Sequence, residues 1–214
     1  MLYAVFSLPR AGSHFLQGGL LSHPRVRDED EALESFGEAK KADLESKSKD
    51  KFWHGILVKH HHLENDVLPW LLENVDKTVL LERKNKLRQA VSLNKAHKTG
   101  VWRVGYYTKE EKTDVKVSVQ VSKSEVKALD ERTRRLHSLV FAKMKDPIMV
   151  YYEDLCKDYQ NQIQKVLRHL GLGCDVNIEA QTERQQTRAL SQNISNYHEL
   201  RRQCLGTKYE KWFS

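Results

Sequence analysis

The residues best suited to binding an anion lie in a turn near the start of the chain. An apolar run, Leu2 to Leu8, leads into that turn, and an amphipathic segment follows it; the turn reads Pro9, Arg10, Ala11, Gly12, Ser13 and His14. At a strand–turn–helix junction the first backbone N–H groups of the helix have no intrahelical partner, and the helix dipole adds positive potential there. Gly12 lets the backbone approach a ligand, Ser13 offers a hydroxyl and Arg10 a permanent charge. The turn therefore predicts a phosphate- or sulfate-binding loop.

This loop is not a Walker A loop. That motif needs two glycines five residues apart followed by Lys-Ser or Lys-Thr, and no lysine follows Gly12. Because short motifs match by chance, the loop taken alone is equally compatible with an ordinary turn that happens to contain an arginine.

Two further predicted strands end in charged residues. Lys77 to Arg83 reads as a strand, and the helical pattern after it places Ser92 nine residues beyond Arg83 and Arg88 on the same helix face as Ser92. Phe52 to Lys59 reads as a buried strand that runs into three histidines, His60, His61 and His62. The carboxyl ends of parallel strands are where α/β folds bind ligands.

The three consecutive histidines are candidates for zinc ligands. Neighbouring residues of an extended chain point to opposite faces, so the three could not converge on one ion. The chain also contains no HExxH sequence. We therefore predict no metal site.

Composition indicates one soluble globular domain spanning 1–214, with 39% hydrophobic and 30% charged residues. The predicted strands and helices favour an α/β fold: a P-loop-like domain with a central parallel sheet flanked by helices. No apolar run could span a bilayer, and the N-terminal segment lacks the basic start of a signal peptide. Three widely spaced cysteines favour reduced thiols and a cytoplasmic location. The net charge of +7 attracts anions in general without singling out nucleic acid.

Two stretches resemble the signatures of sulfotransferases that use 3'-phosphoadenosine 5'-phosphosulfate (PAPS). SLPRAGSHFL resembles the loop that grips the 5'-phosphosulfate, although the family usually has threonine where this chain has His14. LERKNKLRQAVSL resembles the second signature, whose arginine and downstream serine hold the 3'-phosphate; these match Arg83 and Ser92, with Arg88 assisting. Some branches use a spacing of eight, which would place Lys84 in the role of the arginine.

The same resemblance implies candidates for the chemical step. VKHHH is similar to a Lys-Thr-His element, which assigns Lys59 to the sulfuryl group and His61 to the acceptor hydroxyl. Related enzymes have a catalytic glutamate at a fixed interval after a His-Pro pair; here His23-Pro24 places it at Glu31, and the neighbouring acids make a slip to Glu29 easy. The C-terminal segment resembles that of bacterial carbohydrate sulfotransferases, with Arg188 as a weaker candidate for closing over the nucleotide.

The resemblance implies a sulfotransferase that transfers a sulfuryl group from PAPS to a hydroxyl, with a carbohydrate or glycolipid as the expected acceptor, and that releases 3',5'-adenosine bisphosphate. It implies neither a metal nor a nucleic-acid partner, and it leaves a homodimer open. A P-loop-type kinase and a catalytically inactive nucleotide-binding module are the alternatives. The kinase would need a Walker A lysine and an aspartate at a strand end, where this chain has Glu82-Arg83.

Overall fold

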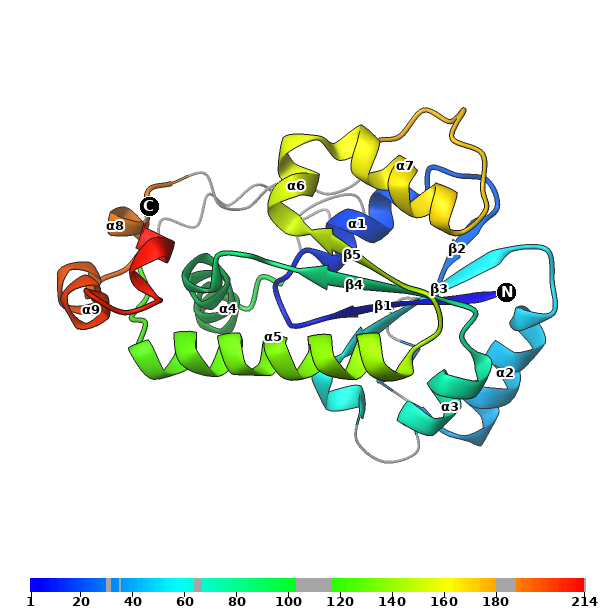
Figure 1. The fold of residues 1–214 in the computed structure, drawn as a ribbon, viewed down its shortest axis with the longest axis horizontal. Coiled ribbons are helices and arrows are strands. Elements are labelled where there is room, and N and C mark those ends of the chain that lie inside the picture. The colour runs from blue at the N-terminus through cyan, green and yellow to red at the C-terminus, as the bar shows by residue number, and fades with distance from the viewer. Residues whose placement is uncertain (30–31, 35, 64–66, 103–116, 180–187, 214) are drawn as a thin grey trace.

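The computed structural model describes residues 1–29, 32–34, 36–63, 67–102, 117–179 and 188–213. Five parallel strands form one sheet in the order β2-β3-β1-β4-β5, with helices on both of its faces (Figure 1). The elements are β1 (Leu2–Ser7), α1 (Ser13–Leu20), β2 (Val26–Asp28), α2 (Glu38–Ser48), β3 (Trp53–Lys59), η1 (His60–Leu63), α3 (Val67–Asn74), β4 (Lys77–Glu82), α4 (Lys86–Thr99), α5 (Lys123–Lys143), β5 (Pro147–Tyr151), α6 (Tyr152–Lys157), α7 (Tyr159–His169), α8 (Leu190–Asn193), α9 (Tyr197–Cys204) and η2 (Glu210–Phe213). The predicted α/β fold with a central parallel sheet is confirmed.

The central strand β1 is buried along its whole length. Its side chains alternate between two apolar cores, as the two-residue period of a strand requires. Leu2, Ala4 and Phe6 face the core shared with α3, α4 and α5. Tyr3 and Val5 face the core shared with α1 and α7. Burial on both faces explains the nearly continuous apolar sequence of this strand.

The strand order brings the carboxyl ends of three strands together. Ser7, the last residue of β1, is in register with Lys59 of β3 and with Leu81 of β4. Strands in a sheet lie about 4.8 Å apart, so the segments that follow β1, β3 and β4 leave the sheet close together, at the carboxyl-terminal end of its strands. The anion-binding loop, the histidines and Arg83 are therefore neighbours in the fold.

Two sequence predictions about local structure are wrong. The apolar sequence from Pro147 to Leu155 predicts one continuous strand, but β5 ends at Tyr151 and α6 begins at the next residue. An alternating valine pattern predicted a strand over 115–121. Within its described part, 117–121, Val119 and Val121 are buried as expected, but the segment forms only an isolated bridge from Val119 to Ile194.

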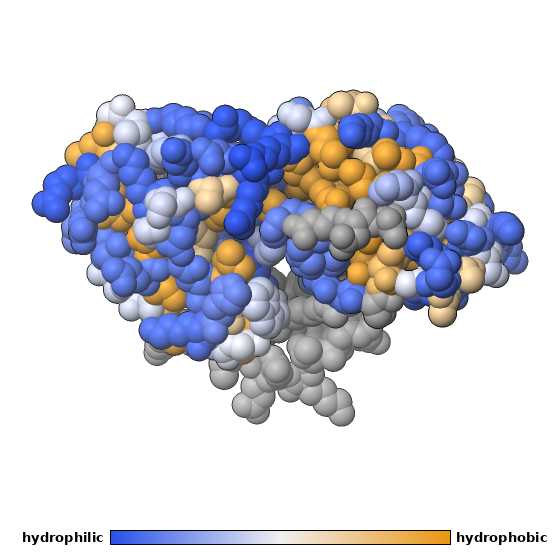
Figure 2. Space-filling model, turned by 90° about the horizontal axis from the view of Figure 1, so that it is seen from below, coloured by the Kyte–Doolittle hydropathy of each residue, from blue (hydrophilic) through white to orange (hydrophobic). Residues whose placement is uncertain are grey.

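The surface on the α5 side is mostly polar, with one larger hydrophobic area beside a hollow (Figure 2). Helix α5 begins with a capping box, the Ser-x-x-Glu pattern of Ser122 to Glu125, in which these two residues satisfy each other's backbone N–H groups. None of the helices in the described part of the chain is both long and apolar enough to cross a membrane.

Candidate active site

The loop between β1 and α1 has the backbone of an anion-binding turn. Arg10 and Gly12 both adopt positive φ angles, 64° and 100°. Gly12 is the N-cap of α1 and supplies no side-chain cap, and the N-terminal end of a helix favours an anion. Space also requires glycine here, since a Cβ on Gly12 would lie 2.4 Å from Cδ2 of Tyr152.

The two sulfotransferase-like signatures meet at Arg10. Its Nε donates to the Ser92 hydroxyl at 3.0 Å, and its Nη1 donates to the Trp102 carbonyl. Its own carbonyl accepts from Nη1 of Arg83 at 3.3 Å. Gln89 of α4 donates to the carbonyl of Pro9 at 2.8 Å. The loop after β1 and the helix after β4, about eighty residues apart in sequence, therefore form one site.

This site concentrates buried positive charge. Arg83 and Ser92 are each 6% exposed. Burial, and then the nearby charge of Arg83, lowers the pKa of Arg10 to about 10. Burial also lowers the pKa of Arg83, and the charge of Arg88 contributes in the same direction. Three arginine side chains gathered at one site favour a multiply charged anion.

Lys84, the alternative to Arg83, points elsewhere. Its Nζ donates to Asp154 at 2.9 Å and lies 4.2 Å from the centre of the Tyr151 ring. Its side chain is 49% exposed. Of the two spacings, the geometry therefore favours the nine-residue one from Arg83 to Ser92.

The remaining residues of the predicted nucleotide site are placed as follows. Ala11 is buried, while Pro9, Ser13 and His14 are partly exposed. Arg188 lies just before α8, and its carbonyl accepts from Nδ2 of Asn193 at 3.2 Å. The Oδ1 of Asn193 in turn accepts from Lys95 of α4 at 2.5 Å. These contacts place Arg188 near the C-terminal half of α4.

A second polar cluster lies where β3 ends. Nζ of Lys59 donates to Oε1 of Glu34 at 2.7 Å. The same oxygen lies 3.7 Å from Nε2 of His61 and 3.2 Å from Nε2 of His62. The hydrogen bond from Lys59 is the largest cause that lowers the pKa of Glu34 to about 2. We call Glu34, Lys59, His61 and His62 the β3-end cluster.

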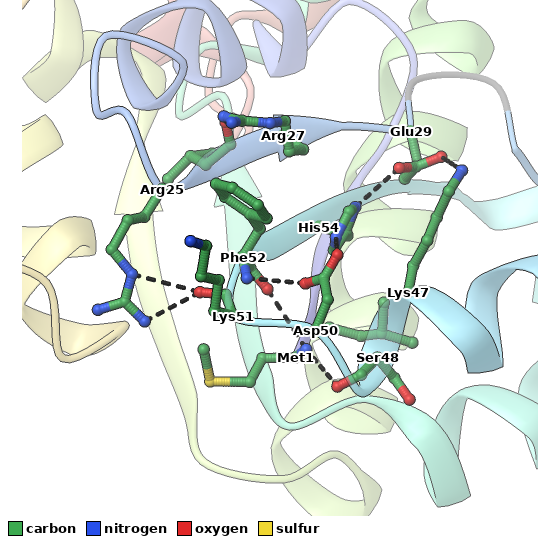
Figure 3. A network of polar contacts seen from close by, with 12 residues as sticks. Met1, Arg25, Arg27, Glu29, Lys47, Ser48, Asp50, Lys51, Phe52 and His54 are labelled. Carbon is green, nitrogen blue, oxygen red and sulfur yellow. Dashed lines mark hydrogen bonds and ion pairs between the residues drawn. The ribbon is translucent and has the colours of Figure 1, made fainter.

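Two expectations about this region need correction. The histidines do not continue an extended chain: His60–Leu63 forms the 3-10 helix η1, so His61 and His62 both approach one carboxylate. The candidate Glu29, the slip position for the catalytic base, faces a different set of groups (Figure 3). It accepts from Nδ1 of His54 at 2.9 Å and from Lys47 at 2.7 Å. His54 is near the start of β3, about 16 Å along the strand from Lys59, so Glu29 is not near the β3-end cluster.

The other candidate base, Glu31, lies outside the described residues. Its role stays a prediction.

Glu34, His61 and His62 place potential metal-ligand atoms within 4.8 Å of one another. Two contacts oppose a metal ion there. Nδ1 of His62 accepts the backbone N–H of Lys59 at 3.2 Å, so the neutral ring carries its proton on Nε2, the atom that faces Glu34. The ammonium group of Lys59 also lies against the same carboxylate. Among the described residues, this cluster is better suited to an ion-paired lysine than to a dication.

Sequence reasoning missed several residues that shape the site. Glu34 was overlooked within a run of acids, and nothing local indicates that it meets Lys59, 25 residues away. The ring of Tyr152 touches the loop at Gly12, and its centre lies 4.6 Å from the Arg83 guanidinium. An aromatic residue directly after a core strand was the only available signal.

A parallel sheet with a cationic loop after its central strand defines a nucleotide- or anion-binding α/β protein. The family model described as "Stf0 sulphotransferase" matches residues 63–199. The chain therefore belongs to the Stf0 sulphotransferase family and is an enzyme of the PAPS-dependent sulfotransferase class.

The chain is also similar to individual proteins. The chain is 26% identical to Nodulation protein H of Rhizobium tropici, in an alignment that covers 99% of this chain and 92% of that protein. A sulfotransferase from Alicyclobacillus acidocaldarius shares the fold, with a TM-score of 0.52, 12% identity and 85% of each chain covered. A mouse sulfotransferase, SULT7A1, solved with PAP, gives a TM-score of 0.47 at 18% identity, covering 82% of this chain and 60% of that one.

Proposed function

We propose that this enzyme transfers a sulfuryl group from PAPS to a hydroxyl group of a carbohydrate or glycolipid. The observation that carries the donor assignment is the convergence of Arg10, Arg83 and Ser92 beside a glycine-containing loop. A donor with phosphate groups at both its 3' and 5' positions matches a site with two connected cationic regions. The bound donor supplies the sulfuryl group and leaves as 3',5'-adenosine bisphosphate.

The protein's part is to position groups and to balance charge. Arg10 and the N–H groups at Gly12 and Ser13 bind the 5'-phosphosulfate. Arg83, Ser92 and Arg88 bind the 3'-phosphate, and Arg188 covers the nucleotide from the C-terminal segment. Sulfuryl transfer resembles phosphoryl transfer, in which charge develops on the transferred oxygens and on the leaving oxygen. Lys59, at the end of β3, stabilises that charge.

Either Glu31 or His61 removes the proton from the acceptor hydroxyl. The side chain of His61 is 48% exposed, and its Nε2 lies 3.7 Å from Oε1 of Glu34. Glu31→Gln and His61→Gln, tested separately, distinguish the two. The variant that lacks the base should lose activity by roughly a hundredfold or more, and if both retain it, both assignments are wrong.

We also propose that residues 1–214 act as one sulfotransferase domain in the cytoplasm. The free thiols of Cys156, Cys174 and Cys204 support the location. Support for a sugar acceptor comes from the resemblance of the C-terminal segment to bacterial carbohydrate sulfotransferases.

The test is release of 3',5'-adenosine bisphosphate from PAPS in the presence of four acceptor classes: free oligosaccharides, glycolipids, a tyrosine peptide and a simple phenol. We expect release that depends on a sugar-containing acceptor, without added metal. Transfer only to the peptide or the phenol would contradict the acceptor class. Binding of the nucleotide without transfer to any acceptor would favour the inactive module.

A further inference from the structure

The connection between β4 and α4 is fixed by one carboxylate that no sequence signature singles out. Glu153, in the first turn of α6, accepts the backbone N–H of Lys84 through Oε2 at 2.9 Å and that of Asn85 through Oε1 at 3.0 Å. A carboxylate that accepts two parallel N–H groups fixes both the position and the orientation of the peptide segment. That segment directly follows Arg83.

Arg83 itself is held on several sides. Its guanidinium lies 4.6 Å from the centre of the Tyr152 ring, the residue before Glu153. Its carbonyl accepts from Nζ of the buried Lys86 at 2.5 Å. With 6% of its surface exposed, Arg83 has little room to adopt another position. The start of α6 therefore contacts the Arg83 side chain through Tyr152 and accepts hydrogen bonds from the backbone just after Arg83 through Glu153.

The same contacts set the start of α4. Oδ1 of Asn85 caps this helix by accepting the N–H of Arg88 at 2.9 Å, and Nδ2 of Asn85 donates to the carbonyl of Trp212 at 2.9 Å. A cap fixes where a helix begins and therefore where its later side chains lie. Ser92, about two turns on, meets Arg10 at 3.0 Å. A shift at Asn85 would move Arg88 and Ser92 together.

We propose that Glu153 is a positioning residue that determines selectivity for nucleotides bearing a 3'-phosphate. The proposal rests on the proposed function, in which Arg83, Arg88 and Ser92 bind that phosphate. Glu153 does not touch the nucleotide; it holds the peptide from which these three side chains extend.

The charge of Glu153 and its positioning role predict opposite effects of Glu153→Gln on binding of the 3'-phosphate. Its carboxylate is one of the groups that raise the pKa of Arg83, so it also opposes the binding of a nearby anion. If charge were its main effect, Glu153→Gln would strengthen binding of the 3'-phosphate. If positioning dominates, the same variant weakens it, because an amide NH2 group would face one of the two backbone N–H donors.

The experiment compares the dissociation constants of 3',5'-adenosine bisphosphate and 5'-AMP, measured by calorimetry on the full chain. The dissociation constant of 5'-AMP divided by that of 3',5'-adenosine bisphosphate isolates the contribution of the 3'-phosphate. We expect Glu153→Gln to lower the ratio roughly tenfold, with little change in the affinity for 5'-AMP. If Glu153 only stabilised the fold, the substitution would weaken the binding of both nucleotides equally and leave the ratio unchanged.

The neighbouring Asp154→Asn is the matched control. It removes an exposed ion pair with Lys84 and should leave the ratio within about twofold. If Glu153→Gln fails to fold, Glu153→Asp takes its place; its shorter side chain can reach only one of the two N–H groups, and we expect an intermediate fall. An unchanged or increased ratio overturns the proposal. A wild-type enzyme without preference for the 3'-phosphate would instead contradict the proposed function.

Discussion

Replacing Gly12 by alanine would add one methyl group where the backbone and the packing both oppose it. The φ angle of 100° lies in the left-handed region, which costs an alanine roughly 1–2 kcal/mol. The new Cβ would lie 2.4 Å from Cδ2 and 3.0 Å from Cε2 of Tyr152, and overpacking of this kind costs about 1–3 kcal/mol. Together these terms predict a loss of roughly 2–5 kcal/mol, against a typical total stability of about 5–15 kcal/mol.

Equilibrium urea unfolding, followed by the fluorescence of the four tryptophans, measures this loss. The two causes separate in a double-mutant cycle with Tyr152→Leu. In that background the clash is relieved but the φ angle is not, so Gly12→Ala should cost only about 1–2 kcal/mol. Gly173→Ala is the matched control, because nothing lies within 4 Å of its added Cβ; it should stay within about 0.5 kcal/mol of wild type. An equally small effect of Gly12→Ala would refute the reasoning.

Two other substitutions test the packing within the sheet and the charges of the β3-end cluster. Gly55→Ala would place a Cβ 2.3 Å from Oη of Tyr3 and 2.6 Å from Nε2 of Gln17; we expect a loss of about 1–3 kcal/mol in urea unfolding, and a loss below 0.5 kcal/mol would show that the pair moves aside. The pKa of Glu34 is lowered from 4.5 to about 2, chiefly by Lys59, so its stabilising effect is present above pH 4.5 and is lost as the pH falls toward 2. Wild type should therefore lose stability more steeply than Glu34→Gln over that interval, by at most about 1 kcal/mol because the side chain is 41% exposed; parallel pH curves would contradict this.

The elements that could be predicted from sequence are those whose signal is local. The apolar runs of β1, β3 and β4 gave the sheet, and the spacing of Leu87, Ala90, Val91 and Ala96 gave the buried face of α4. The short edge strand β2 was missed because three residues carry too little pattern. The end of β5 was misplaced because an apolar strand continues directly into a helix.

The residues of the candidate site also differ in whether a local sequence signal predicts them. Arg10, Arg83 and Ser92 could be found because each lies in a short sequence next to a strand end, and the structure brings them together. Glu34 could not be found, because its contact with Lys59 joins residues that are 25 positions apart in the sequence. The role of Glu153 depends on the pairing of β4 with β5, a contact across about seventy residues.

The most direct test of the central claim is binding of 3',5'-adenosine bisphosphate, with ATP and magnesium as the comparison ligand. The account predicts tight binding without magnesium that weakens at least tenfold in Arg83→Ala, since that variant removes a buried charge that faces the 3'-phosphate. The absence of binding, or a preference for ATP with magnesium, would contradict it.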